Sequence, residues 1–186
     1  RGNRKHRSVQ HIDLREHLVA ELGAGVKRLG HRLDAVVCNA GIMALPRREA
    51  AFGVELQLFT NHVGHFLLAT GLLDRLADDG RVVVVSSAAH LRAPPEGIRF
   101  DDLGAERSYS PWTAYGQSKL CNLLFPRELA RRLEGTGVTA NALHPGVVAS
   151  GFGQTYGGLT GFFIKLAHPF MIGAERGART QVWLAS

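Results

Sequence analysis

Short apolar runs alternate along the chain with stretches that carry a helical pattern. The runs predict buried strands, because a segment that is apolar at consecutive positions suits a strand covered on both faces, as in the four valines at 82–85. The stretches between them space their apolar side chains for one helical face. The predicted strands are 8–12, 34–38, 80–85 and 138–143, and the predicted helices are 14–29, 54–76, 112–133 and 175–184.

This order of strand and helix predicts an α/β fold with a doubly wound parallel sheet and right-handed crossovers. The 186 residues fit a single domain, 1–186. In such sheets, ligands bind outside the carboxyl ends of the strands. Small or polar residues follow all four predicted strands: Asp13, then 39–41, then Ser86 and Ser87, then 144–146. Each group alone fits an ordinary turn, but four at the same edge favour a ligand crevice.

Tyr115 and Lys119 lie four residues apart within a predicted helix, so they share one helical face. An ordinary tyrosine, with a pKa of about 10, is a poor base at neutral pH. An ammonium about 5 Å away, at an effective dielectric of about 20, favours the phenolate by about 3 kcal/mol, or about two pKa units. We therefore expect Lys119 to lower the pKa of Tyr115 enough for proton exchange with an alcohol or carbonyl. By itself the spacing also fits a packed ring and a solvated amine.

Other polar residues near these positions carry weaker signals. Ser87 follows a strand, where a hydroxyl can hold a substrate oxygen or cap a turn. Asn61 lies in an apolar helical stretch, where an amide has either a specific hydrogen-bonding role or a buried group to satisfy. His62 and His65 are three apart, but no acidic or cysteine partner is spaced to complete a metal site, so we expect packing or surface roles.

Composition narrows the classes of protein. The net charge of +6 comes largely from the basic start, and because no aromatic-basic platform accompanies it, no nucleic-acid partner is expected. Two cysteines are too few for a disulfide framework, which favours a reducing compartment and a cytoplasmic location. The longest uncharged stretch, 135–164, is too polar and glycine-rich to span a membrane. The chain starts at Arg1 without a secretory signal, which suggests a fragment or processed product.

Taken together, the motifs resemble the short-chain dehydrogenase/reductase family, in particular its retinol-dehydrogenase-like branch. The resemblance implies a Rossmann-type NAD(P)-binding domain and a hydride-transferring oxidoreductase. The matching segments run almost end to end: 13–14, 38–41, 61–66, 85–87, 115–119 and 144–148.

The resemblance implies a role for each motif residue. Tyr115 would be the general acid/base, Lys119 would lower its pKa and hold the nicotinamide ribose, Ser87 would orient the substrate carbonyl, and Asn61 would maintain a water-linked proton relay with Lys119. The cofactor, NAD or NADP, would contact Asp13, Leu14, Asn39, Ala40, Gly41, Tyr115, Lys119, Pro145, Gly146, Val148 and Ser150.

The chain departs from the family pattern at several points. Cys38 replaces a common Asn, Ser87 and Tyr115 are separated by a long insertion, and Pro126 predicts a kink beyond the catalytic turn. The first two strands and the glycine-rich pyrophosphate turn have no counterpart in the sequence. Without them, the strands at 8–12 and 34–38 would be separated by about 14 Å, so we expect them to pair directly or the first to be poorly ordered.

Two functions from different classes stay open. The chain is part of a longer oxidoreductase, or it is a catalytically inactive Rossmann-like binding protein. The apolar, aromatic segment 151–170 matches the family's substrate cover and suggests a lipophilic alcohol, aldehyde or ketone, while a pair of core helices would explain it as well. The choice between NAD and NADP cannot be read from these residues. The oligomeric state stays open as well; relatives commonly pair through the two long helices, 54–76 and 112–133, which would be the contact surfaces of a homo-oligomer.

Overall fold

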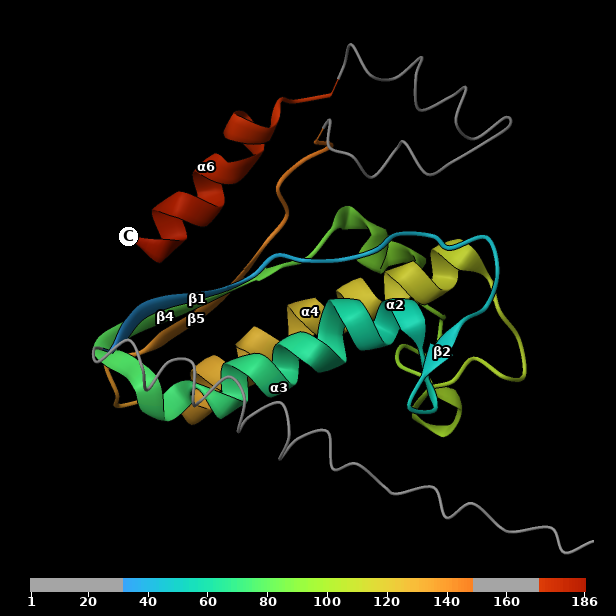
Figure 1. The fold of residues 1–186 in the computed structure, drawn as a ribbon, viewed down its shortest axis with the longest axis horizontal. Helices are drawn as coiled ribbons and strands as arrows, with labels where there is room; N and C mark the ends of the chain where they lie inside the picture. The colour runs from blue at the N-terminus through green and yellow to red at the C-terminus, as the bar shows by residue number, and fades with distance from the viewer. Residues whose placement is uncertain (1–31, 149–170) are drawn as a thin grey trace, which may run out of the picture.

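The computed structural model describes residues 32–148 and 171–186. A parallel three-stranded sheet forms its centre (Figure 1). The strands are β1 (Leu33–Cys38), β4 (Leu76–Val85) and β5 (Thr139–Leu143), in the order β1-β4-β5. Both pairings are parallel, which confirms the predicted fold class. The strand and helix predicted at 8–12 and 14–29 lie outside the described residues, as does their proposed pairing.

The four valines occupy the middle strand of the sheet. Val82 and Val84 belong to the core beneath one face, while Val83 and Val85 belong to the core on the other. Because successive side chains of a strand point to opposite faces, a strand covered on both sides needs apolar residues at every position. Figure 1 shows the covering layers: α3 (Gly64–Gly71) and α4 (Pro111–Arg132) lie on one side of the sheet and α6 (Ala174–Ala185) lies on the other.

Strand β4 is longer than its sequence predicts. It begins at Leu76 rather than Gly80. Leu33 pairs with Leu76, but Ala35 pairs with Arg81, so the register shifts and the residues between bulge out of the ladder. Leu76 is almost completely buried, whereas the polar Asp78 and Asp79 behind it are exposed. Because these two aspartates interrupt the apolar pattern, the hydrophobicity of the sequence does not indicate where the strand begins.

The helix predicted at 54–76 is divided into shorter elements, which corrects that prediction. A small hairpin, β2 (Ala50–Ala51) and β3 (Val54–Glu55), takes its first two residues. The Glu55 carboxylate then caps the following turn by accepting a hydrogen bond of 2.9 Å from Leu58 N. The helical part comprises α2 (Leu56–Leu58), the π-helical η1 (Phe59–Val63), α3 (Gly64–Gly71) and the 3₁₀ turn η2 (Leu73–Arg75).

Helix α4 (Pro111–Arg132) confirms the helix predicted at 112–133. The helical assignment continues through Pro126, and the predicted kink stays a prediction. Two 3₁₀ turns, η3 (Ala88–Arg92) and η4 (Phe100–Asp102), lie in the long connection between β4 and α4. Among the helices of the described residues, none has both the length and the apolar character to cross a bilayer.

Candidate active site

The carboxyl edge of the sheet brings the four predicted catalytic residues into one hydrogen-bonded neighbourhood. Ser87 follows β4, while Tyr115 and Lys119 lie on α4, and Asn61 comes from the π-helical η1. Tyr115, Lys119 and Asn61 are all buried. The carbonyl of Val85, at the very end of β4, links Lys119 to Asn61 by way of Asn122, and Tyr115 is hydrogen-bonded to Ser87.

Tyr115 is 8% exposed, and its phenol is hydrogen-bonded to the Ser87 side chain. Ser87 also caps η3, because its hydroxyl accepts a hydrogen bond of 3.2 Å from Ala89 N. Trp112, one turn before Tyr115, meets the phenol ring edge to face with 6.1 Å between ring centroids. The tyrosine is therefore held between a hydroxyl at the end of the central strand and an aromatic wall.

The expected fall in the pKa of Tyr115 is not found, which corrects the electrostatic argument from the sequence. Burial raises the pKa of Tyr115, and the hydrogen bond from Ser87 offsets only part of this rise. Lys119 Nζ lies 5.7 Å from the centre of the ring, but burial also lowers the pKa of Lys119 to about 8. A buried ammonium is costly, so the lysine holds its charge less firmly than a surface lysine and favours the phenolate less.

Lys119 has unused hydrogen-bonding capacity. Lys119 is 5% exposed, and its ammonium donates one hydrogen bond, of 3.0 Å, to Val85 O. An ammonium has three donors, so two have no protein acceptor among the described residues. The backbone beneath it is fixed, because Ser86 Oγ donates to Lys119 O at 2.7 Å. A buried cation held in place with spare donors is suited to bind an oxygen-rich ligand.

Asn61 is fully buried within the π-helical turn η1. Its side-chain amide makes two hydrogen bonds to the backbone of the loop after β1. Oδ1 accepts from Ile42 N at 2.8 Å, and Nδ2 donates to Ile42 O at 2.9 Å. Nδ2 also donates to Ser118 Oγ at 2.9 Å. A single π turn inside a helix is frequent at functional sites, because it redirects side chains and main-chain carbonyls. Here it brings Asn61 against helix α4; the water-linked relay with Lys119 stays a prediction.

Asn122 and two histidines complete this network, and the sequence reasoning missed the role of Asn122. Its Nδ2 donates to Asn61 O at 2.9 Å and to Val85 O at 3.2 Å. His65 Nδ1 lies 2.9 Å from Asn61 O and His62 Nδ1 lies 3.1 Å from Asn122 Oδ1. Both partners are acceptors, so both rings carry their proton on Nδ1. Burial lowers the pKa of each histidine, which favours the neutral rings. Instead of only packing, the histidines support the polar network.

Apart from Tyr115 and Lys119, the residues predicted to bind the cofactor lie after β1, after β5 or outside the described residues. Asn39 and Ala40 follow β1 and are exposed at the edge of the sheet. Gly41 lies deeper: a Cβ there would be 2.9 Å from Asn61 Oδ1 and 3.8 Å from Lys119 Nζ, so no side chain fits. Pro145, Gly146 and Val148 follow β5. Asp13, Leu14, Ser150 and the segment 151–170 lie outside the described residues.

The turn after β5 has the backbone conformation of a glycine turn. Gly146 adopts a φ of +87°, in the left-handed region that favours glycine. Val148 forms a parallel bridge with Ile172, which joins this turn to the start of α6. The residues present fit a nicotinamide cofactor. At this edge of the sheet, Gly41 has no side chain to block a ligand, the Lys119 ammonium has donors without an acceptor among the described residues, and Gly146 forms a glycine turn.

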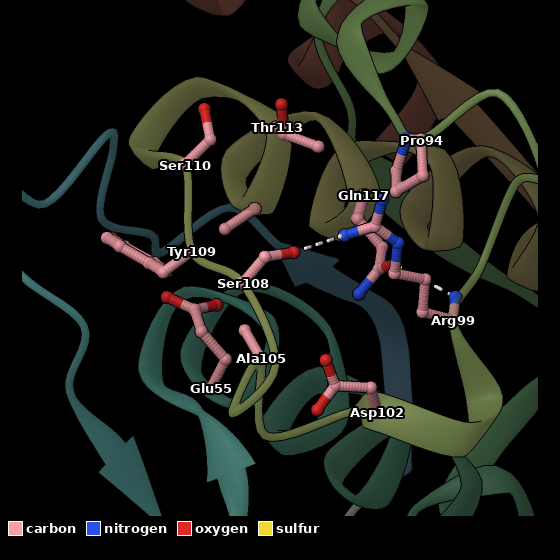
Figure 2. A pocket seen from close by; sticks show the side chains of 11 residues that line it. Glu55, Pro94, Arg99, Asp102, Ala105, Ser108, Tyr109, Ser110, Thr113 and Gln117 are labelled. Atoms are coloured by element: carbon pink, nitrogen blue, oxygen red, sulfur yellow. Dashed lines mark hydrogen bonds between the residues drawn. The ribbon is translucent and has the colours of Figure 1, made fainter.

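A separate pocket of about 180 Å³ lies on the far face of α4 (Figure 2). Gln117 lines it two residues after Tyr115, which is about 200° around the helix. Arg99 closes one wall: its backbone N donates to Gln117 Oε1 at 3.0 Å and its Nη1 donates to Ser108 Oγ at 3.2 Å. These contacts hold the long connection against α4, and the pocket is not part of the candidate active site.

Curated proteins match this chain, although no protein-family model does. Retinol dehydrogenase 12 from Mus musculus is 45% identical over 157 residues, which are 83% of this chain and 48% of that protein. A probable oxidoreductase from Streptomyces antibioticus is 55% identical over 120 residues, 62% of this chain and 39% of that protein. The chain spans about half the length of the curated relatives that it matches.

Solved structures share the fold. A 3-alpha-hydroxysteroid dehydrogenase from Pseudomonas, in complex with NADH, gives a TM-score of 0.70 at 24% identity, with 92% of this chain and 72% of that chain covered. A short-chain dehydrogenase from Burkholderia cenocepacia, in complex with NADP, gives 0.66 at 20% identity, with 92% and 65% covered.

A parallel sheet, a buried Tyr-Lys pair at its carboxyl edge and these relatives together define the class of protein. The chain is similar to members of the short-chain dehydrogenase/reductase family in sequence and in fold. Within that family, its sequence resembles the retinol dehydrogenases.

Proposed function

We propose that this chain forms the catalytic part of an NAD(P)-dependent oxidoreductase that interconverts an alcohol and a carbonyl compound. The observation that carries the proposal is the buried Tyr115 phenol, hydrogen-bonded to Ser87 on the same edge where two donors of the Lys119 ammonium have no acceptor among the described residues. A proton donor, a hydroxyl beside it and a cation are the groups that such a reaction needs next to a substrate oxygen.

Each residue has a defined part in the reaction. Ser87 donates a hydrogen bond to the substrate oxygen and orients it toward Tyr115. In reduction, the Tyr115 phenol gives its proton to that oxygen; in oxidation, the phenolate takes the proton from the alcohol. The bound cofactor supplies or accepts the hydride. Lys119 favours the phenolate by its charge, which is strongest when other oxygens also hold the ammonium.

NAD or NADP is the expected cofactor. Solved relatives of the same fold are complexes with NADH and with NADP. In this chain, Lys119 would donate to the nicotinamide ribose, and Asn39, Ala40 and Gly41 would line the adenosine side. Pro145, Gly146, Val148 and Ser150 would hold the nicotinamide, and Asp13 and Leu14 would lie near the adenine.

A lipophilic alcohol, aldehyde or ketone is the proposed substrate. The segment 151–170 would cover it, because its aromatic and aliphatic residues suit an apolar ligand held by burial. Trp112 is partly exposed and packs against the Tyr115 ring, so it offers an apolar side chain next to the phenol. Relatives named retinol dehydrogenases are in keeping with a substrate of this kind.

Titration with NADPH and NADH tests the proposal. The purified protein is expected to enhance the fluorescence of one of them at micromolar concentration, and Lys119→Met is expected to weaken that binding about tenfold, the effect of losing a charge-assisted hydrogen bond. If neither nucleotide binds at millimolar concentration, the chain by itself is the inactive binding protein instead.

A further inference from the structure

The carbonyl of Val85 is shared by two donors. Lys119 Nζ donates to it at 3.0 Å, and Asn122 Nδ2 donates to it at 3.2 Å. A peptide carbonyl has two lone pairs, so both are in use. Both donors are interior, since Asn122 is fully buried and Lys119 is 5% exposed. The last carbonyl of the central strand therefore determines the position of the Lys119 ammonium.

The orientation of Asn122 is determined by its partners. One hydrogen of Nδ2 goes to Val85 O and the other to Asn61 O at 2.9 Å, and neither oxygen can donate. The opposite atom, Oδ1, lies 3.1 Å from His62 Nδ1. Every hydrogen of this amide is used, so Asn122 occupies one side of the Val85 carbonyl permanently.

Lys119 is thereby confined to the other side of that carbonyl. This side faces the loop after β1, because a Cβ on Gly41 would lie 3.8 Å from Lys119 Nζ. The ammonium, with its free N–H groups, therefore lies beside Gly41 at the candidate cofactor edge. If Asn122 were absent, the ammonium could move across the carbonyl and turn away from this edge.

We propose that Asn122 is a positioning residue for Lys119, acting through the Val85 carbonyl that both side chains share. The inference rests on the proposed function, since it gives Lys119 the task of holding the nicotinamide ribose. Asn122 does not itself contact the cofactor. Its effect on cofactor binding must therefore disappear when the lysine is absent.

A double-mutant cycle on NADPH or NADH binding tests this dependence, using whichever nucleotide the parent protein binds. Asn122→Leu, of similar size, removes both donated hydrogen bonds. We expect its dissociation constant for the nucleotide to rise about tenfold in the parent protein and to stay unchanged in the Lys119→Met background. Equal weakening in both backgrounds, or none in either, would overturn the inference, because a structural defect acts with or without the lysine.

Controls separate this inference from the proposed function. Gln117→Leu removes another buried amide from α4, on the face opposite Lys119, and is expected to lower the melting temperature without altering nucleotide binding. If Asn122→Leu does not fold, as judged by the absence of a cooperative unfolding transition, Asn122→Asp takes its place in the double-mutant cycle. This variant keeps the shape of the side chain and loses both donors, and the same outcomes support or overturn the inference. If Lys119→Met leaves nucleotide binding unchanged, the role proposed for Lys119 fails first; if only the cycle fails, the proposed function stands.

Discussion

At the scale of one residue, the buried charge of Lys119 lowers the stability of the fold. Burial lowers its pKa from 10.5 to about 8, because the ammonium has left water for an interior with one carbonyl partner. Between those two pH values the unfolded chain binds more protons than the folded one, so the free energy of unfolding rises with pH across that range. Below about pH 8, the full penalty for charging a buried lysine is present.

Replacing Lys119 by Met should therefore stabilise the protein at neutral pH. We expect a gain of about 2 kcal/mol at pH 7, because the Asn122 amide still satisfies Val85 O after the ammonium is removed. The gain should shrink as the pH approaches 10. Urea denaturation at pH 7 and pH 9.5 measures both effects. A variant that is less stable at pH 7, or that keeps the parent's pH dependence, would contradict the burial argument.

Sequence reasoning proposed candidate catalytic residues, but it did not identify the residues that hold them in place. Tyr115, Lys119 and Asn61 are unusual in type and spacing, and the structure brings them together. Ser118 and Asn122 were passed over, because single polar residues on a helix ordinarily face solvent. Their spacing gave a signal, since Tyr115, Ser118, Lys119 and Asn122 follow the i, i+3, i+4, i+7 pattern of one helical face. The pKa of Tyr115 was misjudged because burial cannot be read from spacing.

At the scale of elements, the contact between α4 and η3 sets the distance between Tyr115 and Ser87. Gly116, next to Tyr115, lies so close to η3 that a Cβ would be 2.7 Å from Ala89 O, Ala93 N and Arg92 C. All three are backbone atoms, which cannot rotate away as a side chain can. The absence of a side chain at 116 is thus what lets the turn that begins after Ser87 pack against α4.

Gly116→Ala should push η3 away from α4. We expect a loss of about 2 kcal/mol in the free energy of unfolding, the usual size of an overpacking defect, together with reduced turnover as Ser87 moves from Tyr115. Gly64→Ala is the matched control: it is also helical, and its nearest new contact would be Phe59 O at 3.6 Å. That control should be neutral or slightly stabilising. Similar losses of stability in the two variants, measured by urea denaturation, would refute the role of the close contact.

The elements themselves were predictable where one pattern holds throughout. Strands β1 and β5 and helices α4 and α6 lie within one or two residues of their predicted bounds. The elements within 54–76 were not predictable in this way. The apolar residues of this segment are compatible with one long helix, and they are equally compatible with a hairpin strand, a π turn and the start of β4. Only the pairing of Leu76 with Leu33 and the hydrogen bonds of Asn61 distinguish these arrangements, and both depend on residues distant in sequence.

At the scale of the whole molecule, the described sheet supplies one edge at which three strands end and the candidate catalytic residues meet (Figure 1). The cytoplasmic location stays a prediction, and the oligomeric state stays open. The outer surfaces of α3 and α4 keep partly exposed apolar side chains, among them Phe66 and Leu124, and these helices would be the contact surfaces of a homo-oligomer. The glycine-rich pyrophosphate turn has no counterpart in the described residues.

The most direct test of the account is turnover by Tyr115→Phe. We expect the oxidation of NADPH or NADH by a lipophilic aldehyde to fall about a thousandfold, because the phenol's proton is the one transferred, while nucleotide affinity and the melting temperature change little. Tyr109→Phe is the matched control: it removes a hydroxyl that donates to Leu45 O, away from the site, and should leave turnover intact. Turnover near the parent level in Tyr115→Phe would contradict the account.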